Sequence, residues 1–246
     1  MRLTGEERIA PKAHAVVINR DSGPILLSEK QNVFTTFKVS NNRQYNNWLA
    51  TNTFEQKQKD FFGVYIRVQL GNIRTDKARE LACIAEKYCA DDIRITISQN
   101  LLLKFLRKEA LPSLFRELEK NGLAEAGYNS IADITACPGT DTCNLGIASS
   151  TGITKELERV IAEEYPDLIF NHDIKIKISG CMNACGQHSI AQIGFHGSSI
   201  KVQNGVLPAL QVLLGGGVLG NGKGRVGDKI IKVPSKSGAD LLRFLL

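Results

Sequence analysis

The sequence predicts an α+β fold that is divided into two units, and three observations lead to this prediction. The first is a run of alternating apolar and polar residues followed by helical spacing, found twice between residues 62 and 122. The second is a further succession of helix and strand patterns from residue 150 onwards. The third is a set of four cysteines on the loops of the second unit, at residues 137, 143, 181 and 185. Period-two alternation is typical of a half-buried strand, and apolar residues three or four apart are typical of an amphipathic helix.

The composition is that of a soluble globular protein. The 246 residues are 43% hydrophobic and 23% charged, and the chain is long enough for one large or two ordinary domains. Residues 1–8 are not followed by an apolar run, and no stretch approaches the roughly 20 apolar residues that span a bilayer. We therefore expect a cytoplasmic protein, in which thiols stay reduced. The net charge of +6 suits an anionic substrate or an acidic redox partner and argues against nucleic acid as a ligand.

The N-terminal residues carry the weakest pattern. Short apolar runs at 15–18 and 23–27 are compatible with strands or packing segments, and the polar residues 41–47 predict a loop. Trp48 follows, and we expect its ring to anchor this loop against a core or the edge of a cofactor. Residues 1–47 are interpreted as an N-terminal extension or linker.

The first unit reads as strand, helix, strand, helix. Strands are expected over 62–70 and 92–98, the second with Ile93, Ile95 and Ile97 on its buried face. The helices are expected over 76–88, after Thr75 as N-cap, and over 109–121, ended by Gly122. The first helix should bury Ala78, Leu81, Ala82, Ala85 and Tyr88, and the second Leu111, Leu114, Phe115 and Leu118. Cys83 and Cys89 are interpreted as small core residues of this unit.

The opposite face of this expected sheet is polar. Arg67, Gln69, Arg94 and Thr96 should project from it, and Gln99 and Asn100 follow at the end of the second strand. A solvated sheet face is the ordinary explanation of such a pattern. A second interpretation is that these guanidinium and amide groups hold a ligand with several carboxylates, because arginine pairs with carboxylate through two hydrogen bonds.

The second unit begins near residue 128. A helix is expected over 150–165, stopped by Pro166, with Ile153, Leu157, Val160 and Ile161 inward. A strand over 173–179 leads directly to Cys181, and its alternation places Lys175 and Lys177 on the surface. Further strands are expected over 189–195, 200–203 and 229–233, before a final helix from about residue 237.

The four cysteines form two close pairs. Cys137 and Cys143 are separated by five residues, and Cys181 and Cys185 by three. Four thiolates in two pairs are the ligand set of a [4Fe–4S] cluster. Structural zinc also accepts four thiolates, but its pairs are usually separated by two to four residues, and a disulfide does not suit a reducing compartment. The spacing favours the cluster, with zinc and unligated core or disulfide cysteines as the alternatives.

Two motifs carry a resemblance to a known family. The pattern Cys-x5-Cys, a helix, and then Ser-Gly-Cys-Met-Asn-Ala-Cys-Gly resembles the cluster domain of the siroheme-dependent sulfite and nitrite reductases. Residues 94–103, Arg-Ile-Thr-Ile-Ser-Gln-Asn-Leu-Leu-Leu, resemble the Arg-x-Thr-x-x-Gln-Asn stretch of that family's ferredoxin-like half-domain. The resemblance implies a ferredoxin-like half-domain over 48–127, followed by an α/β iron–sulfur and siroheme-binding domain with a mixed sheet over 128–246.

The resemblance also implies cofactors and their ligands. A [4Fe–4S] cluster would be held by Cys137, Cys143, Cys181 and Cys185, and the sulfur of Cys185 would also ligate the siroheme iron. Thr142 and Asn183 would tune the cluster through hydrogen bonds. Because siroheme carries many carboxylates, the resemblance favours the ligand interpretation of the polar face, which gives four siroheme contacts: Arg67, Arg94, Gln99 and Asn100.

The implied activity is the six-electron reduction of sulfite to sulfide or of nitrite to ammonia. Ferredoxin or a flavoprotein would donate the electrons. Family members are usually about twice as long, with two related halves, so we interpret this chain as one half or a fragment that is inactive alone. Its partner would be the missing N-terminal half or a subunit, and no catalytic residue is assigned. The alternatives are a non-catalytic iron–sulfur electron-transfer subunit and a structural zinc domain.

Overall fold

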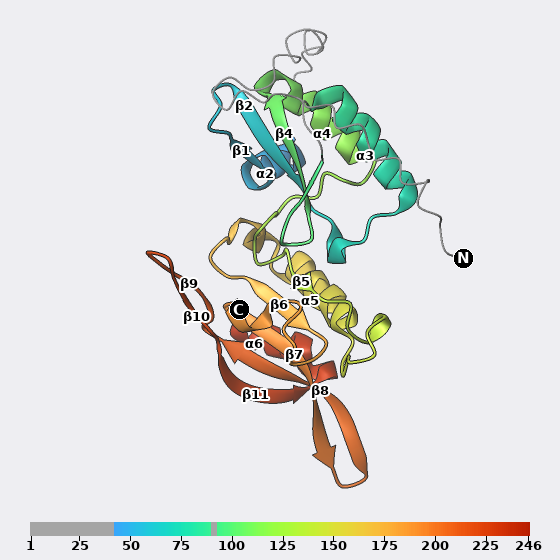
Figure 1. Ribbon diagram of the computed structural model, residues 1–246, viewed down its shortest axis with the longest axis vertical. Helices are drawn as coiled ribbons and strands as arrows, with labels where there is room; N and C mark the ends of the chain where they lie inside the picture. The colour runs from blue at the N-terminus through green and yellow to red at the C-terminus, as the bar shows by residue number, and fades with distance from the viewer. Residues whose placement is uncertain (1–41, 90–92) are drawn as a thin grey trace, which may run out of the picture.

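The computed structural model describes residues 42–89 and 93–246 and shows two bodies stacked along the long axis of the molecule (Figure 1). The runs expected at 15–18 and 23–27 lie outside the described residues. The upper body contains a four-stranded sheet, and the lower body contains a five-stranded sheet. Within the described residues, no helix has the length and apolar character needed to cross a membrane.

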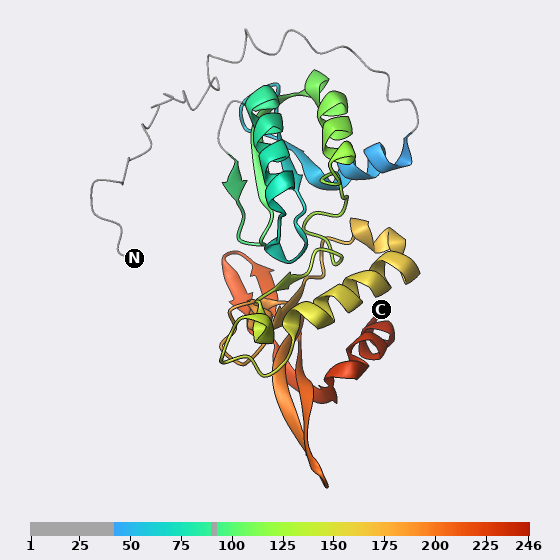
Figure 2. The ribbon, with the colours of Figure 1, turned by 90° about the vertical axis from the view of Figure 1, so that its right-hand side faces the viewer.

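The upper body is an antiparallel sheet covered by two helices. The strands are β1 (Thr53–Glu55), β2 (Phe61–Ile66), β3 (Arg94–Ile95) and β4 (Leu101–Arg107), in the order β1-β2-β4-β3. Helices α3 (Thr75–Tyr88) and α4 (Leu111–Lys120) lie side by side on one face (Figure 2). The expected helices are therefore confirmed within the usual uncertainty of their ends. Leu111, Leu114, Phe115 and Leu118 are all buried, as predicted.

The polar segment before Trp48 forms a helix, and the loop expected over 41–47 is wrong for the described residues. Asn42 caps α2 (Arg43–Asn52), because its side-chain oxygen accepts hydrogen bonds from the backbone N–H groups of Gln44 and Tyr45. Trp48 is fully buried and packs against Tyr45 and Phe115. Its ring therefore belongs to the core of the upper body, and the expected domain boundary at residue 48 falls inside a helix.

The second expected strand, over 92–98, is also wrong. Among residues 93–98, which the structure describes, Arg94 and Ile95 pair with β4, and a turn follows in which the Gln99 N–H donates to the Thr96 carbonyl. Ile95 and Ile97 are 84% and 81% exposed. The central strand β4 lacks regular alternation, because Phe105 has a φ of 58° and the pairing with β2 shifts register there. A bulge of this kind hides a strand from a search for period two.

Two details of the first unit differ from expectation as well. β2 ends at Ile66, and Leu70 lies in a short 3₁₀ turn with a φ of 56°. In α3, Ile84 is buried, whereas Ala82 and Cys83 are exposed. Cys89 is half-buried beside the core. The interpretation of Cys83 as a core residue is therefore wrong.

The lower body contains the mixed sheet that was expected. Its strands are β5 (Thr135–Ala136), β6 (Ile176–Ser179), β7 (Ile193–Val202), β8 (Gly205–Leu214) and β11 (Asp228–Pro234), in the order β11-β8-β7-β6-β5. The β5–β6 and β6–β7 pairs are parallel, and the other two pairs are antiparallel. A small hairpin of β9 (Gly217–Gly220) and β10 (Lys223–Arg225) lies apart.

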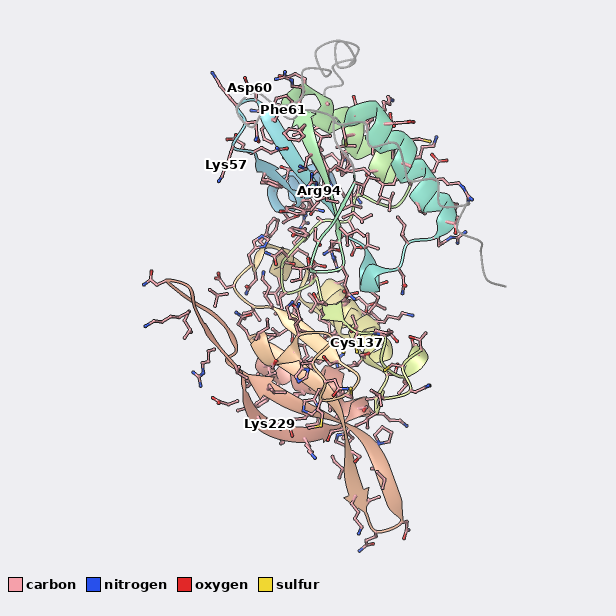
Figure 3. The ribbon with its side chains drawn as sticks, in the orientation of Figure 1. Lys57, Asp60, Phe61, Arg94, Cys137 and Lys229 are labelled. Carbon is pink, nitrogen blue, oxygen red and sulfur yellow. The ribbon has the colours of Figure 1, made fainter. Side chains whose placement is uncertain are left out.

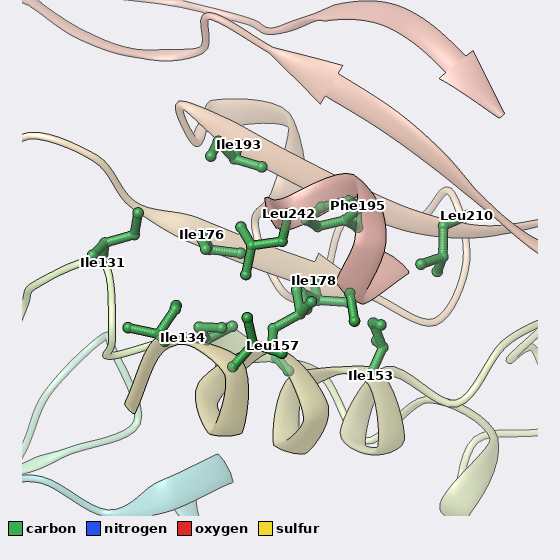
Figure 4. Packing of buried hydrophobic residues seen from close by; sticks show 14 of the residues in the cluster. Ile131, Ile134, Ile153, Leu157, Ile176, Ile178, Ile193, Phe195, Leu210 and Leu242 are labelled. Carbon is green, nitrogen blue, oxygen red and sulfur yellow. The ribbon is translucent and has the colours of Figure 1, made fainter. Parts of the chain in front are cut away.

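Two helices cover one face of this mixed sheet. α5 (Ser150–Glu164) and α6 (Gly238–Leu245) contact each other and bury the apolar side chains of the strands, as Figure 4 shows for Ile176, Ile178 and Phe195. The inward residues predicted for α5 are confirmed: Ile153, Leu157, Val160 and Ile161. The opposite face of the sheet carries the polar side chains and the second cysteine loop.

Candidate iron–sulfur site

The two cysteine loops leave neighbouring parallel strands at the same edge of the sheet. Cys137 directly follows β5, and Cys181 comes two residues after the end of β6. The strands run parallel, with Thr135 beside Lys177 and Ala136 beside Ile178. The Cys137 N–H continues this ladder by donating to the Ile178 carbonyl at 3.1 Å. The fold therefore brings the first cysteine of each pair to the same end of the sheet.

The two loops touch each other through backbone, without side chains between them. A Cβ atom on Gly180 would lie 2.5 Å from the Gly139 Cα of the first loop. One on Gly186 would lie 1.9 Å from the Ile178 carbonyl oxygen on β6 and 3.1 Å from the Cys137 backbone nitrogen of the first loop. The backbone N–H groups of Ile147 and Ala148 both donate to the Gly180 carbonyl, at 2.8 and 3.2 Å. Only glycine permits these approaches. The loops are consequently held as one backbone cradle, although they are far apart in sequence.

All four cysteines of the cradle have free thiols. The Cys137 sulfur accepts a hydrogen bond from the Gly180 N–H at 3.0 Å, and the Ser150 hydroxyl donates to the Cys137 carbonyl at 2.5 Å. Cys181 is buried, whereas Cys143 and Cys185 are exposed. Within the residues that the structure describes, no three His, Cys, Asp or Glu side chains are already grouped as a metal site. The donor set nevertheless fits a cluster: four soft thiols on two touching loops, with an N–H group directed at one sulfur.

Thr142 and Asn183 lie within the two loops and are exposed. The Thr142 N–H donates to the Gly139 carbonyl, which keeps the first loop tightly turned. Their hydrogen bonding to a cluster remains a prediction.

Beneath the second loop lies a layer of buried histidines that the sequence analysis missed. His188 and His196 are 3% and 7% exposed, and their ring centroids are 4.8 Å apart. His188 Nδ1 and the Gly186 N–H both contact the Ser179 hydroxyl, at 2.8 and 3.0 Å. Burial, with smaller contributions from His196 and Lys229, lowers the pKa of His188 to about 4. His188 is therefore neutral near pH 7. Its position three residues after Cys185 is the one signal that could have indicated it.

Two lysines, one on β6 and one just before it, are more enclosed than expected. Lys175 and Lys177 are half-buried, and burial lowers the pKa of both ammonium groups. Lys177 donates to the Gln187 side chain at 2.6 Å, and Lys175 donates to the Asn129 carbonyl. The expectation of surface lysines is wrong, because the end of the second cysteine loop folds back over Lys177 and the Asn129 backbone contacts Lys175.

Arg67 does not lie on an open polar face, and the structure corrects that expectation. It is 7% exposed and pairs with the three carboxylates of Glu125, Asp133 and Glu158, at 2.7, 3.6 and 3.5 Å. It also donates to the Ala132 carbonyl at 2.6 Å. Burial raises the pKa of Asp133 and of Glu158, although the Arg67 charge acts in the opposite direction. Arg67 thus joins the two bodies, since its partners come from the lower body and the linker to it.

The two residues that end the Arg-x-Thr-x-x-Gln-Asn stretch also reach across to the lower body. Gln99 pairs with the backbone of Ala136, and the Asn100 amide donates to Asp133 at 2.8 Å. Arg94 is exposed on β3 and lies well away from Cys137 in Figure 3. The four side chains expected to contact siroheme are therefore divided between a buried interdomain network and an exposed strand.

Comparison with known proteins gives the same two-part organisation. The model of the nitrite/sulfite reductase ferredoxin-like half domain matches residues 54–121, and that of the nitrite and sulphite reductase 4Fe-4S domain matches residues 127–245. The matched segments fall on the upper and lower bodies, respectively.

Several curated relatives are reductases. The chain is 28% identical over 155 residues to the chloroplastic ferredoxin–nitrite reductase of Spinacia oleracea, a match covering 61% of this chain and 25% of that protein. It is 26% identical over 210 residues to the ferredoxin–nitrite reductase of Synechococcus elongatus, covering 80% and 40%. It is 30% identical over 143 residues to an assimilatory-type sulfite reductase of Nitratidesulfovibrio vulgaris, covering 58% and 63%. The chain therefore spans well under half the length of the nitrite reductases.

Solved structures show the same fold. The NirA protein of Mycobacterium tuberculosis superposes with a TM-score of 0.64 at 25% identity, over 78% of this chain and 36% of that chain. Dissimilatory sulfite reductase I superposes with a TM-score of 0.57 at 11% identity, over 70% and 57%, and supports the fold alone. These findings confirm the expected α+β architecture, and the family's cofactors are the [4Fe–4S] cluster and siroheme predicted from the sequence. The two family models together account for both bodies, and the chain belongs to the nitrite and sulfite reductase family.

Proposed function

We propose that this chain is one half of a siroheme [4Fe–4S] oxidoreductase that reduces sulfite to sulfide or nitrite to ammonia. Its two units are proposed to extend over 48–127 and 128–246, and the first also takes in the start of α2 before residue 48. The cluster is assigned to Cys137, Cys143, Cys181 and Cys185, with the Cys185 sulfur shared with the siroheme iron. The observation that carries the proposal is the backbone cradle, in which two cysteine loops meet at the end of adjacent parallel strands. When bound, the cluster supplies electrons and the siroheme supplies an iron that binds the anion.

The surroundings of the cradle suit a large, partly apolar cofactor. Leu145, Ile147 and Met182, on the two cysteine loops, are 66%, 48% and 68% exposed. Large apolar side chains exposed together around a ligand loop are typical of a binding surface. Arg94 is retained as a proposed contact for a siroheme carboxylate, and Thr142 and Asn183 as proposed hydrogen-bonding neighbours of the cluster. For Arg67, Gln99 and Asn100, the contacts across the interface between the two bodies favour a structural role over siroheme binding.

The cluster assignment has a direct test. Replacing Cys137 or Cys143 with serine should abolish cluster assembly, because a hydroxyl is a poor ligand for iron in a thiolate site. The measurement is iron and acid-labile sulfide per chain, after purification without oxygen. Survival of both in the two variants would contradict the assignment, and chelatable zinc without sulfide would select the zinc alternative.

The activity of the chain by itself is the second part of the proposal. A buried anionic cofactor and an anionic substrate both need cations on several sides. We propose that the chain alone retains little siroheme and reduces neither sulfite nor nitrite. The missing half, or a partner subunit, would supply the cations that both the cofactor and the substrate need. Ferredoxin, the donor named for the nitrite reductases above, or a flavoprotein would then deliver electrons. The visible spectrum of the chain should be recorded with and without the missing half. If both spectra show a cluster but lack the red band of siroheme, the non-catalytic electron-transfer alternative is favoured.

One comparison favours a second candidate, a short reductase that works without a second half. The 143 residues matched in the sulfite reductase of Nitratidesulfovibrio vulgaris are 58% of this chain and 63% of that protein, so the two are of similar length. Turnover of sulfite by the purified chain with a chemical electron donor would select this candidate. A size measurement in the same preparation would show whether two copies associate to replace the missing half.

A further inference from the structure

We infer that Gln99, on the upper body, is a positioning residue for Cys137. It holds β5, the strand that leads directly to this cysteine. This inference rests on the proposed cluster assignment. The Gln99 side-chain amide donates to the Ala136 carbonyl at 2.8 Å, and its oxygen accepts from the Ala136 N–H at 3.0 Å. Ala136 is 2% exposed and immediately precedes Cys137. Both polar groups of the residue before the ligand are therefore satisfied by one side chain.

This pairing takes the place of a missing strand. β5 is two residues long and lies at the edge of its sheet, with β6 as its only neighbour in that sheet among the described residues. In a parallel ladder, successive residues direct their backbone groups to opposite sides. The Cys137 N–H is directed at the Ile178 carbonyl on β6, so Ala136 faces the open edge, where Gln99 pairs with it as a neighbouring strand would.

Gln99 is itself fixed by local structure. It lies in the left-handed region with a φ of 65°, and its N–H donates to the Thr96 carbonyl at 3.2 Å. A Cβ atom on Gly71 would lie 3.2 Å from the Gln99 Cβ, so the turn of the upper body packs closely against the glutamine stem. Because the Gln99 side chain is held both at its base and at its amide, the position of β5 follows the position of the upper body.

A second contact fixes the segment that leads to Ala136. Asp133 accepts from the Asn100 amide at 2.8 Å and lies 3.6 Å from Arg67, while Arg67 donates to the Ala132 carbonyl at 2.6 Å. Residues 132–136 are thus held at both ends by the upper body. Ligand groups must be held within about 0.5 Å of their working geometry, and short edge strands seldom provide that alone.

The test compares Gln99→Leu, which keeps the volume but loses both hydrogen bonds, with Gln203→Leu in the exposed turn between β7 and β8. In the cluster-free chain, hydrogen exchange of the Ala136 amide should accelerate about tenfold in Gln99→Leu only. In the cluster-loaded chain, release of iron to a chelator should accelerate by a similar factor, and the electron paramagnetic resonance spectrum of the reduced cluster should change. If Gln99→Leu fails to fold, Gln99→Glu serves instead, because it keeps the acceptor and loses the donor.

The outcomes separate this inference from the proposed function. If the loaded Gln99 variant has the spectrum and iron-release rate of Gln203→Leu, the positioning role is wrong and the cluster assignment stands. The positioning role is equally wrong if the variant only lowers the free energy of unfolding. If the unaltered chain assembles no cluster at all, the proposed function is wrong and the inference is wrong with it.

Discussion

The segment that leads into the first cysteine loop is held in part by the neighbouring body, whereas the segment that leads into the second is held by its own. Cys137 follows a two-residue edge strand whose outer side is paired with Gln99 of the upper body. The second loop follows β6, which has strands on both sides, and folds back onto Ser179 and His188 of the lower body. The approach to Cys137 therefore depends on how the two bodies are joined, whereas the approach to Cys181 does not.

This difference indicates what the upper body contributes to the site. Its sheet was expected to face the cofactor with free arginine and amide groups. The structure instead directs three of these side chains at residues 132–136, just before the first cysteine. Separating the two bodies should consequently disturb Cys137 more than it disturbs the second loop.

The largest expected effect comes from removing the charge that joins the bodies. Arg67→Ala leaves Asp133 and Glu158 buried without their cation, which should lower the free energy of unfolding by about 3–5 kcal/mol. Urea unfolding at pH 7 measures this loss. Arg159→Ala, on the exposed face of α5, is the matched control and should leave the unfolding midpoint nearly unchanged.

The same variant carries a prediction about pH. Burial raises the pKa of Asp133 and of Glu158, so their ionised forms disfavour the folded state. Stability is therefore lost as the pH rises from the unfolded pKa of these groups towards the folded pKa, and without Arg67 that loss should be larger. The difference between Arg67→Ala and the unaltered chain should shrink at pH 5 compared with pH 7. A difference that grows as the pH falls would contradict this account of the network.

The next largest effect should come from the backbone contact that defines the second loop. Gly186→Ala would place a methyl group 1.9 Å from the Ile178 carbonyl oxygen, so the loop must move. We expect a loss of about 3 kcal/mol and failure to retain iron. Gly224→Ala, whose added Cβ would lie 3.5 Å from its nearest neighbour, is the control and should retain both. Iron content and urea unfolding of the two variants test this expectation, and an unchanged iron content in Gly186→Ala would contradict it.

How much the sequence could predict differs between the same two regions. The helices α4 and α5 were predicted because their apolar residues recur at helical spacing and are followed by Gly122 and Pro166. The four cysteines were found from spacing alone, since their chemistry does not depend on which face they occupy. β4 was missed because Phe105 has a positive φ, which interrupts the alternation on which strand prediction depends.

The contacts between the two bodies could not be predicted from local patterns. Alternation showed that Arg67 lies opposite the apolar residues of its strand, but not whether that side meets solvent, a cofactor or a second domain. Asn42 was interpreted as part of a loop, although asparagine at a helix N-cap fits the same polar run. The histidine layer was missed because His188 and His196 meet only after β6, β7 and the second loop have folded.

A smaller effect concerns His188, beneath the second loop, and the way in which the free energy of unfolding depends on pH. The pKa of His188 is lowered to about 4 from an ordinary value of 6.5, so its neutral form stabilises the fold. That stability is fully present above pH 6.5 and is lost as the pH falls towards 4. In the cluster-free chain, His188→Gln should reduce this loss, whereas exposed His172→Gln should not. Equal slopes of unfolding free energy against pH in all three proteins would contradict the role of His188.

The smallest expected effect concerns a cysteine outside both loops. Cys83 is exposed on α3, on the upper body, and lies on a different element from the four proposed ligands. Cys83→Ala should therefore leave iron and sulfide content unchanged and alter the free energy of unfolding by less than about 0.5 kcal/mol. Comparison with Cys143→Ala sharpens the test, because both thiols are exposed and only the position of the substitution differs. Loss of iron from Cys83→Ala would show that the upper body supplies a ligand as well as a support.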